Sequence, residues 1–282
     1  MPTLYITDTN ARDQVIEREA RLRPQQPIPL PGCYGRRARR YGRPDLQPVT
    51  VHLPIIPPND WKDLINQSEG KTLKDLRQTV LPPHDQGSTN YCWAHGVTRA
   101  VEIARVWQAL PPLTLAAESI AVPITGGVNR GGSADEALEQ FVLYGACEQR
   151  FWPNNSRREH DAQDGWKTNR LDNRVLAWLD VQTWEEQITL ALHRIPVAIG
   201  LRWWGHLVCQ VDAVITPDGQ VGIGIDNSWG PDWGDNGYAV LDRKHGTADL
   251  GAFAPYSITF PEPYTLNRPR PDDLYMTLPH AP

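Results

Sequence analysis

Cys92 lies where a cysteine can act as a nucleophile. It follows a loop that contains glycine and serine, Gln86-Gly-Ser-Thr-Asn-Tyr, and a helical pattern of apolar residues begins at this cysteine. The N–H groups at a helix N-terminus stabilise an anion, so a cysteine there becomes the reactive thiolate more easily. A buried structural cysteine is the alternative that this position alone leaves open.

A histidine and an asparagine later in the chain could supply a base and the group that orients it. Alternating apolar residues after His206 and before Asn227 predict two antiparallel strands joined by a Pro-Asp-Gly turn. This register makes Asn227 a diagonal neighbour of His206, within side-chain reach. An amide oxygen can accept from one ring nitrogen and leave the other free to take a thiol proton. Either residue alone could equally be a satisfied polar group at a strand end.

Two regions of different periodicity must position these residues. Up to about residue 180 the apolar spacing is helical, beginning at Cys92 and again after a capping box that starts at Ser133. A second capping box at Thr183 opens a helix that ends before Pro196, and beyond it the apolar period changes to two. The predicted strands cover 197–201, 207–215 and 221–225. A helical lobe followed by a sheet lobe predicts an α+β architecture with a cleft between them.

Both ends of the chain are rich in proline. Of 26 prolines, ten fall in residues 1–60 and six in 261–282. These ends are therefore predicted to be extended arms, with a short helix at Arg12–Leu22. We divide the chain into a Pro/Arg-rich N-terminal arm or pro-segment (1–70), a central domain (71–260, with a helical lobe over about 71–180 and a β lobe over about 181–260) and a Pro-rich C-terminal tail (261–282).

Composition narrows the class of protein. A hydrophobic content of 40% and a net charge of −5 are ordinary for a globular protein and argue against nucleic acid as the main partner. The basic run Arg36–Arg43 predicts a solvated arm, with a nucleic acid or an acidic protein surface as the alternative. We expect no membrane span and no signal peptide.

The four cysteines are too widely spaced to suggest a zinc site, and they form no CxxC pair: Cys33, Cys92, Cys147 and Cys209. With no secretory signal, they are expected to be reduced thiols in a cytoplasmic protein. We expect neither a metal nor a cofactor.

Two motifs resemble those of the papain-like cysteine peptidases. The segment Gln86-Gly-Ser-Thr-Asn-Tyr-Cys92-Trp-Ala is similar to the family's nucleophile motif, QGSCGSCWA. The segment Asn227-Ser-Trp-Gly-Pro-Asp-Trp-Gly-Asp-Asn-Gly-Tyr238 matches the family pattern NSWGxxWGxxGY in full. Shorter similarities follow in family order over about residues 71–260: Asp75-Leu-Arg77, Gly131–Gly132 with Ala137, and Tyr144–Gly145. The resemblance implies a papain-like two-lobe fold, with a helical lobe, an antiparallel β-sheet or barrel lobe, and an active-site cleft between them.

The resemblance also implies catalytic roles. Cys92 would attack a peptide carbonyl as a thiolate, and His206 would be its base and later the acid for the leaving amine. Asn227 would hold the imidazole. The Gln86 side chain and the backbone N–H of Cys92 would face the developing oxyanion.

Further residues would bind substrate. The backbone of Gly131 and Gly132 would pair with an extended peptide. By position in the family, Ala134, Gly200 and Leu207 would line a roomy apolar S2 pocket. Trp229 would shield the contact between histidine and asparagine, and Trp233 would lie near the leaving group.

The sequence departs from the family pattern in two places. Thr89 replaces a family cysteine, and no cysteine accompanies Gly131–Gly132, so the usual disulfide is absent. Only Arg202–Gly205 connects the strand ending at Leu201 to the histidine, where family members carry a much longer loop. Because that loop helps to build the substrate pockets, the resemblance carries no substrate preference.

Together these features predict a cysteine peptidase that hydrolyses peptide bonds by a Cys-His-Asn thiolate–imidazolium mechanism, acting on a peptide or protein substrate. The alternative is a papain-fold structural or assembly protein with a vestigial or regulated site. In that case the segments 1–60 and 261–282 would bind partner chains. Acyl transfer or amidase chemistry at the same site also remains open.

Overall fold

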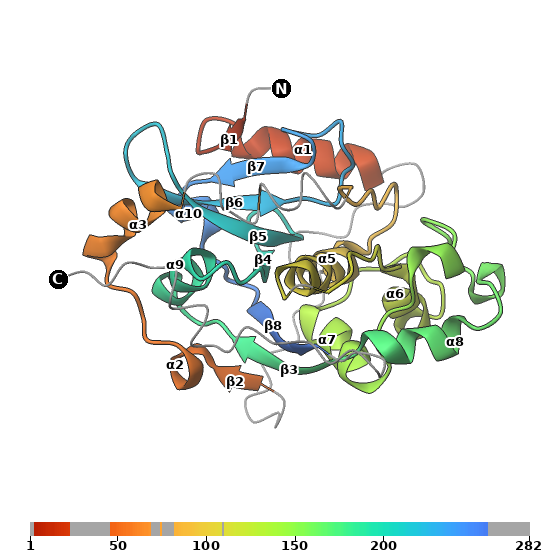
Figure 1. Ribbon diagram of the computed structural model, residues 1–282. Helices are drawn as coiled ribbons and strands as arrows, with labels where there is room; N and C mark the ends of the chain where they lie inside the picture. The colour runs from red at the N-terminus through yellow and green to blue at the C-terminus, as the bar shows by residue number, and fades with distance from the viewer. Residues whose placement is uncertain (1–2, 23–45, 69–73, 75–81, 109, 259–282) are drawn as a thin grey trace.

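A computed structural model describes residues 3–22, 46–68, 74, 82–108 and 110–258 (Figure 1). The basic run Arg36–Arg43, the segment Asp75–Arg77, Cys33 and the C-terminal tail 261–282 lie outside the described residues. The predictions made for them therefore stay predictions.

An eight-stranded sheet forms one side of the described structure, in the order β1-β7-β6-β5-β4-β8-β3-β2. From β7 to β3 in that order, neighbouring strands are antiparallel, as the sequence predicts. The strands are β1 Leu4–Ile6, β2 Leu46–Pro48, β3 Val175–Asp180, β4 Val197–Leu201, β5 His206–Ile215, β6 Val221–Asp226, β7 Tyr238–Leu241 and β8 Ala252–Ile258.

The helices α5, α6, α7 and α8 lie together on the other side of the molecule, where Figure 1 shows α5 between the sheet and the other three, whereas α1, α2, α3, α9 and α10 lie beside the strands. The α-helices are α1 Ala11–Leu22, α2 Val49–His52, α3 Trp61–Gln67, α5 Cys92–Trp107, α6 Glu118–Thr125, α7 Ala134–Leu143, α8 Trp166–Asn169, α9 Trp184–Leu192 and α10 Arg243–Gly246. Short 3₁₀ turns lie at Pro58–Asp60, Gln149–Phe151, Glu159–Asp161 and Arg170–Asn173. The predicted α+β architecture is confirmed.

Local signals in the sequence set several of these boundaries. Ser133 and Thr183 each form the predicted capping box at the start of α7 and α9, with both reciprocal hydrogen bonds present. The hairpin of β5 and β6 turns at 216–219, where the Gly219 N–H donates to the carbonyl of Thr216. Cys209 pairs with Asp226 in this hairpin, close to the register that the sequence predicts.

Two hydrophobic clusters hold the lobes. One lies around α5 and α7 and includes Trp93, Phe141 and Trp178. The other lies between α9 and the sheet and includes Ile188 and Ile199. Burial of such side chains contributes about 1.5–3 kcal/mol each. In the described ranges, no helix combines enough length with enough apolar character to span a lipid bilayer.

The contact between α5 and β5 is close because Gly96 faces Leu207. A Cβ on Gly96 would lie 2.3 Å from the Cδ2 atom of Leu207 and 3.2 Å from its carbonyl oxygen. A larger residue would therefore push the helix off the strand. This approach brings the N-terminus of α5 next to the start of β5.

A buried ion network also joins α5 to the sheet. The Arg99 guanidinium donates to Glu102 at 3.0 Å and to Asp226 at 2.9 Å, and all three residues are almost fully buried. Burial by itself would lower the pKa of the Arg99 guanidinium, but the negative charges of Asp226 and Glu102 and their hydrogen bonds outweigh it and raise that pKa. Glu102 also accepts from the backbone N–H of Leu115 at 2.7 Å and faces the imidazole of His84. Asp226 directly precedes Asn227, so the network fixes the end of β6 against α5.

The described parts of the predicted N-terminal arm pack on the domain. β1 pairs in parallel with β7, and β2 pairs in parallel with β3, so the two edges of the sheet come from the first 48 residues. The predicted helix at Arg12–Leu22 is present as α1, which lies alongside β1 and β7 in Figure 1.

Arg99→Met should lower the free energy of unfolding by about 3–5 kcal/mol, because it leaves two buried carboxylates without their counter-charge. The matched control is Arg158→Met, whose exposed pair with Asp161 at 3.2 Å should contribute about 0–1 kcal/mol. Urea unfolding at pH 7 measures both variants. A loss as small as that of the control would show that the network does not hold α5 to the sheet.

Candidate active site

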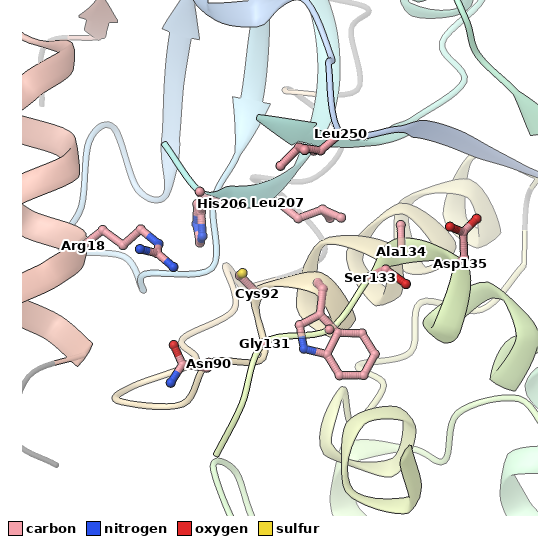
Figure 2. Close-up of a pocket in the computed structure, with 14 residues that line it drawn as sticks. Arg18, Asn90, Cys92, Gly131, Ser133, Ala134, Asp135, His206, Leu207 and Leu250 are labelled. Atoms are coloured by element: carbon pink, nitrogen blue, oxygen red, sulfur yellow. The ribbon is translucent and has the colours of Figure 1, made fainter. Parts of the chain in front are cut away.

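Three of the four predicted catalytic residues come from the edges of elements that meet. Cys92 is the first residue of α5, His206 is the first of β5, and Asn227 directly follows β6. Cys92 and His206 line one pocket, and Figure 2 shows the sulfur turned toward the imidazole. The pocket lies between the helical and sheet elements, as the sequence predicts.

The hydrogen bonds of Asn227 determine the tautomer of His206. Its Oδ1 atom lies 2.8 Å from His206 Nε2 and accepts from the backbone N–H of Ser228 at 2.8 Å. Because the Ser228 N–H donates to this atom, the atom must be the amide oxygen of Asn227, and an amide oxygen can only accept hydrogen bonds. His206 Nε2 therefore carries a proton. Its Nδ1 atom has no hydrogen-bond partner among the described residues and is free to accept a proton from the pocket side.

Aromatic rings enclose the imidazole. The rings of Trp204 and Trp229 have their centroids 4.9 and 5.0 Å from that of His206, which is only 3% exposed. This burial lowers the pKa of His206 to about 3, and the positive charges of Arg18 and Arg21 act in the same direction. The hydrogen bond to Asn227 opposes the shift.

Burial also acts on the thiol. It raises the pKa of Cys92, and the charge of Arg18 together with the backbone groups of Leu207 and Trp93 opposes this effect only in part. The helix N-terminus predicts an easily formed thiolate, but desolvation outweighs it here. Burial thus disfavours a charge on the thiol and a charge on the imidazole when each is considered alone.

Gln86 is not among the residues that line the pocket, but hydrogen bonds hold it next to Ser228, the neighbour of Asn227. Its side-chain N–H donates to the carbonyl of Thr89 at 2.6 Å, and its Oε1 accepts from the hydroxyl of Ser228 at 2.6 Å. Its backbone N–H donates to the carbonyl of Ser228 at 2.9 Å. A side-chain amide nitrogen carries two hydrogens, so one remains for an oxyanion. Thr89, which stands where the family has a cysteine, thus helps to orient this amide.

The predicted substrate-binding residues divide into two groups. Five of them line the pocket together with the candidate nucleophile: Gly131, Gly132, Ala134, Gly200 and Leu207. Leu250, which the sequence analysis did not single out, lines it as well, and the cavity is small, with a volume of about 60 Å³. A Cβ on Gly132 would lie 2.4 Å from the Trp93 ring, so this stretch of backbone requires glycine.

Trp229 and Trp233 are not among the residues that line the pocket. Both are 3% exposed and pack with Trp204 on the far side of His206. Trp229 covers the imidazole, in agreement with its predicted shielding position. The indole N–H of Trp233 donates to Oε1 of Gln14 at 3.1 Å, so this ring contacts α1, and its predicted place near the leaving group stays a prediction.

Sequence reasoning missed further residues of the site besides Leu250. Arg18 and Asn90 line the pocket, and Ser228 orients both Gln86 and Asn227. Ser228 belongs to the motif that starts at Asn227, so its position was available from the sequence. Arg18 lies 74 positions before the cysteine in a segment without a recognised motif, and only the fold brings it to the pocket.

Comparison with known proteins gives one consistent result. No family model matches the sequence. The chain is 25% identical over 207 residues to the senescence-specific cysteine protease SAG12 of Arabidopsis thaliana, covering 63% of this chain and 58% of that protein. It is 25% identical over 198 residues to Peptidase 1 of Dermatophagoides farinae, covering 63% and 61%. Over about two thirds of its length, the chain is therefore similar in sequence to papain-like cysteine proteases. It spans less than two thirds of the length of these relatives.

Solved structures of papain-like peptidases share the fold. Xylellain, a cysteine protease from Xylella fastidiosa, matches with a TM-score of 0.53 at 16% identity, covering 64% of this chain and 83% of that one. Digestive procathepsin L 3 of Tenebrio molitor matches with a TM-score of 0.54 at 18% identity, covering 77% and 76%. The predicted papain-like fold is confirmed. The described cysteines Cys92, Cys147 and Cys209 are free thiols, consistent with a papain-like chain that lacks the usual disulfide.

The free energy of unfolding should fall as the pH drops from about 6.5 to 5. Burial holds the pKa values of His95 and His206 well below their usual range, so below pH 6.5 the unfolded chain binds more protons than the folded chain. Each histidine contributes a slope of up to about 1.4 kcal/mol per pH unit. Urea unfolding at pH 7, 6 and 5 measures the slope, and His95→Gln should make it shallower. A flat profile in the unsubstituted protein would contradict the burial of these imidazoles as neutral groups.

Proposed function

We propose that this protein is a cysteine peptidase with Cys92 as nucleophile, His206 as acid and base, and Asn227 as the residue that orients the imidazole. The observation that supports this most directly is the bond from His206 Nε2 to Asn227 Oδ1 at 2.8 Å, which leaves Nδ1 for the pocket that also contains Cys92. A pocket that reaches the thiol favours an enzyme over a structural protein with a vestigial site.

In the first half of the proposed reaction, the Cys92 thiol gives its proton to Nδ1 of His206. The thiolate and imidazolium stabilise one another, and this attraction offsets the burial that disfavours each charge alone. The thiolate attacks the peptide carbonyl, forming an S–C bond. The negative charge that develops on the oxygen is met by the free N–H of Gln86 and the backbone N–H of Cys92. The C–N bond then breaks, and His206 donates its proton to the leaving amine.

Water completes the proposed cycle. It gives one proton to His206 and attacks the thioester carbonyl, so that the S–C bond breaks and a carboxylic acid leaves. The proton on His206 returns to the thiolate of Cys92. Atoms and charges balance with a peptide and water as the reactants, and the step sequence uses neither a metal nor a redox cofactor.

Substrate class and cellular context are further parts of the proposal. The relatives are named as proteases, which supports a peptide or protein substrate. The backbone at Gly131–Gly132 borders the pocket and could pair with an extended chain. The division of the chain at residues 70 and 260, and a reducing, cytoplasmic location, stay predictions. The free thiols of the described cysteines support the location.

Cys92→Ala should abolish cleavage of a library of unstructured peptides, with a loss of roughly 10³-fold or more, because the thioester can no longer form. Mass spectrometry of the products provides the readout. Cys147→Ala is the matched control. The Cys147 thiol is buried away from the pocket, and this burial raises its pKa to about 11. Equal product yields from Cys92→Ala and the unsubstituted protein would place the activity elsewhere.

Gln86→Ala should lower kcat by about 10²–10³-fold, equivalent to ~2.7–4 kcal/mol, with little change in KM, because the lost donor acts on the transition state. Steady-state kinetics on one peptide from the library measures the effect. Thermal unfolding of the same variant checks that the bonds to Thr89 and Ser228 are not needed for folding. A change confined to KM would show that Gln86 binds substrate and does not stabilise an oxyanion.

A further inference from the structure

Arg18 is a cation of the N-terminal helix that reaches the candidate active site. It is 6% exposed, yet it lines the same pocket as Cys92 and His206. Figure 2 shows its side chain extending from α1 toward the imidazole, on the side away from Ala134 and Asp135. The pocket therefore has a positive group at one end and the carboxylate of Asp135 at the other.

α1 is anchored firmly enough to position this cation. Gln14 accepts two indole hydrogen bonds. Its backbone carbonyl accepts from the N–H of Trp204 at 3.1 Å, and its side-chain Oε1 accepts from the N–H of Trp233 at 3.1 Å. One turn beyond Arg18, the Arg21 guanidinium lies 4.9 Å from the centroid of the Trp229 ring and donates to the carbonyl of that residue at 3.3 Å. The pairing of β1 with β7 holds the start of the same segment.

The helix fills a space that the short link before His206 leaves open. Arg202–Gly205 forms one tight turn, with the Gly205 N–H donating to the Arg202 carbonyl at 3.1 Å. Of this link, Gly205 alone lines the pocket, and α1 adds Arg18 to the lining and covers Trp204 and Trp233. The wall beyond the Cys92–His206 pair thus comes in part from the N-terminal segment.

A peptide lying across the pocket would present its leaving-group half to Arg18. One half of the substrate lies along Gly131–Gly132 in the proposed function, on one side of Cys92, and Arg18 lies on the other side. A guanidinium binds a carboxylate through two parallel hydrogen bonds, and it does so most strongly where water is excluded. A free carboxylate a short distance beyond the scissile bond has the matching charge and shape.

We propose that Arg18 binds the free C-terminal carboxylate of the leaving group, so that the protein removes residues from the C-terminal end of peptides. The inference rests on the proposed peptidase function and adds the substrate class. Asp135 at the opposite end of the pocket supports the same orientation, because its negative charge disfavours a carboxylate there.

Paired peptides that differ only in a free-acid or amidated C-terminus test the proposal. The unsubstituted protein should hydrolyse the free acid with a kcat/KM at least tenfold higher, and Arg18→Ala should abolish this preference. Arg18→Lys keeps the charge and should retain part of it. Arg12→Ala, on an exposed position of the same helix, is the matched control and should retain all of it. Thermal unfolding checks that each variant is folded.

Alkylation of Cys92 gives a second readout that does not depend on turnover. Iodoacetate carries a carboxylate and iodoacetamide does not. The rate with iodoacetate divided by the rate with iodoacetamide, normalised to the same ratio for glutathione, therefore measures how strongly the Arg18 cation attracts a carboxylate to the thiol. Arg18→Ala should lower the normalised ratio at least tenfold, and Arg12→Ala should not change it.

The outcomes separate the two proposals. Equal hydrolysis of the acid and the amide, or a ratio unchanged in Arg18→Ala, overturns the role of Arg18 and leaves the peptidase function standing. Faster hydrolysis of both peptides by Arg18→Ala would show that α1 blocks the site, and this result also overturns the proposed role of Arg18. No hydrolysis of any peptide by the unsubstituted protein overturns both.

Discussion

The site depends on how closely α5 approaches β5. Sulfur and imidazole come from different lobes, so a small shift of the helix would separate them. Two features oppose such a shift: the missing side chain at Gly96, which lets the helix rest against Leu207, and the Arg99 network, which ties the helix to Asp226. Asp226 precedes Asn227 in the chain, so the ion network that positions the helix also positions the residue that orients the imidazole.

Enclosure of His206 has two opposing effects on the proposed chemistry. Surrounding indole rings exclude water and strengthen its bond to Asn227, and this fixes one tautomer. The same surroundings destabilise an isolated charge on either member of the pair. The ion pair is therefore reached only when both charges form together. Ionisation of the buried thiol therefore depends on proton transfer to His206.

Local chemistry made much of the structure predictable. The capping boxes at Ser133 and Thr183, the turn at 216–219 and the alternation in β4 to β6 are signals within a few residues, and the structure contains each of them. The docking of α1 could not be predicted in this way. The buried positions of α1 are Gln14 and Arg18, which are polar, so apolar periodicity does not mark the face of the helix that packs on the sheet. The pairing of Leu4 with Ala239 likewise joins positions at opposite ends of the described chain.

The parallel pairing of β1 with β7 has a consequence for assembly. β1 and α1 are synthesised before the other described elements, but their docking site consists of β7 and the tryptophans at 204, 229 and 233, which follow much later in the chain. The N-terminal segment must therefore wait, unpaired, while the sheet and its hairpin form. Closure of such a long loop is entropically costly and comes late in folding. The wall that carries Arg18 is thus completed only after the thiol and the imidazole are already in place, and the pocket of the nascent protein is open on that side.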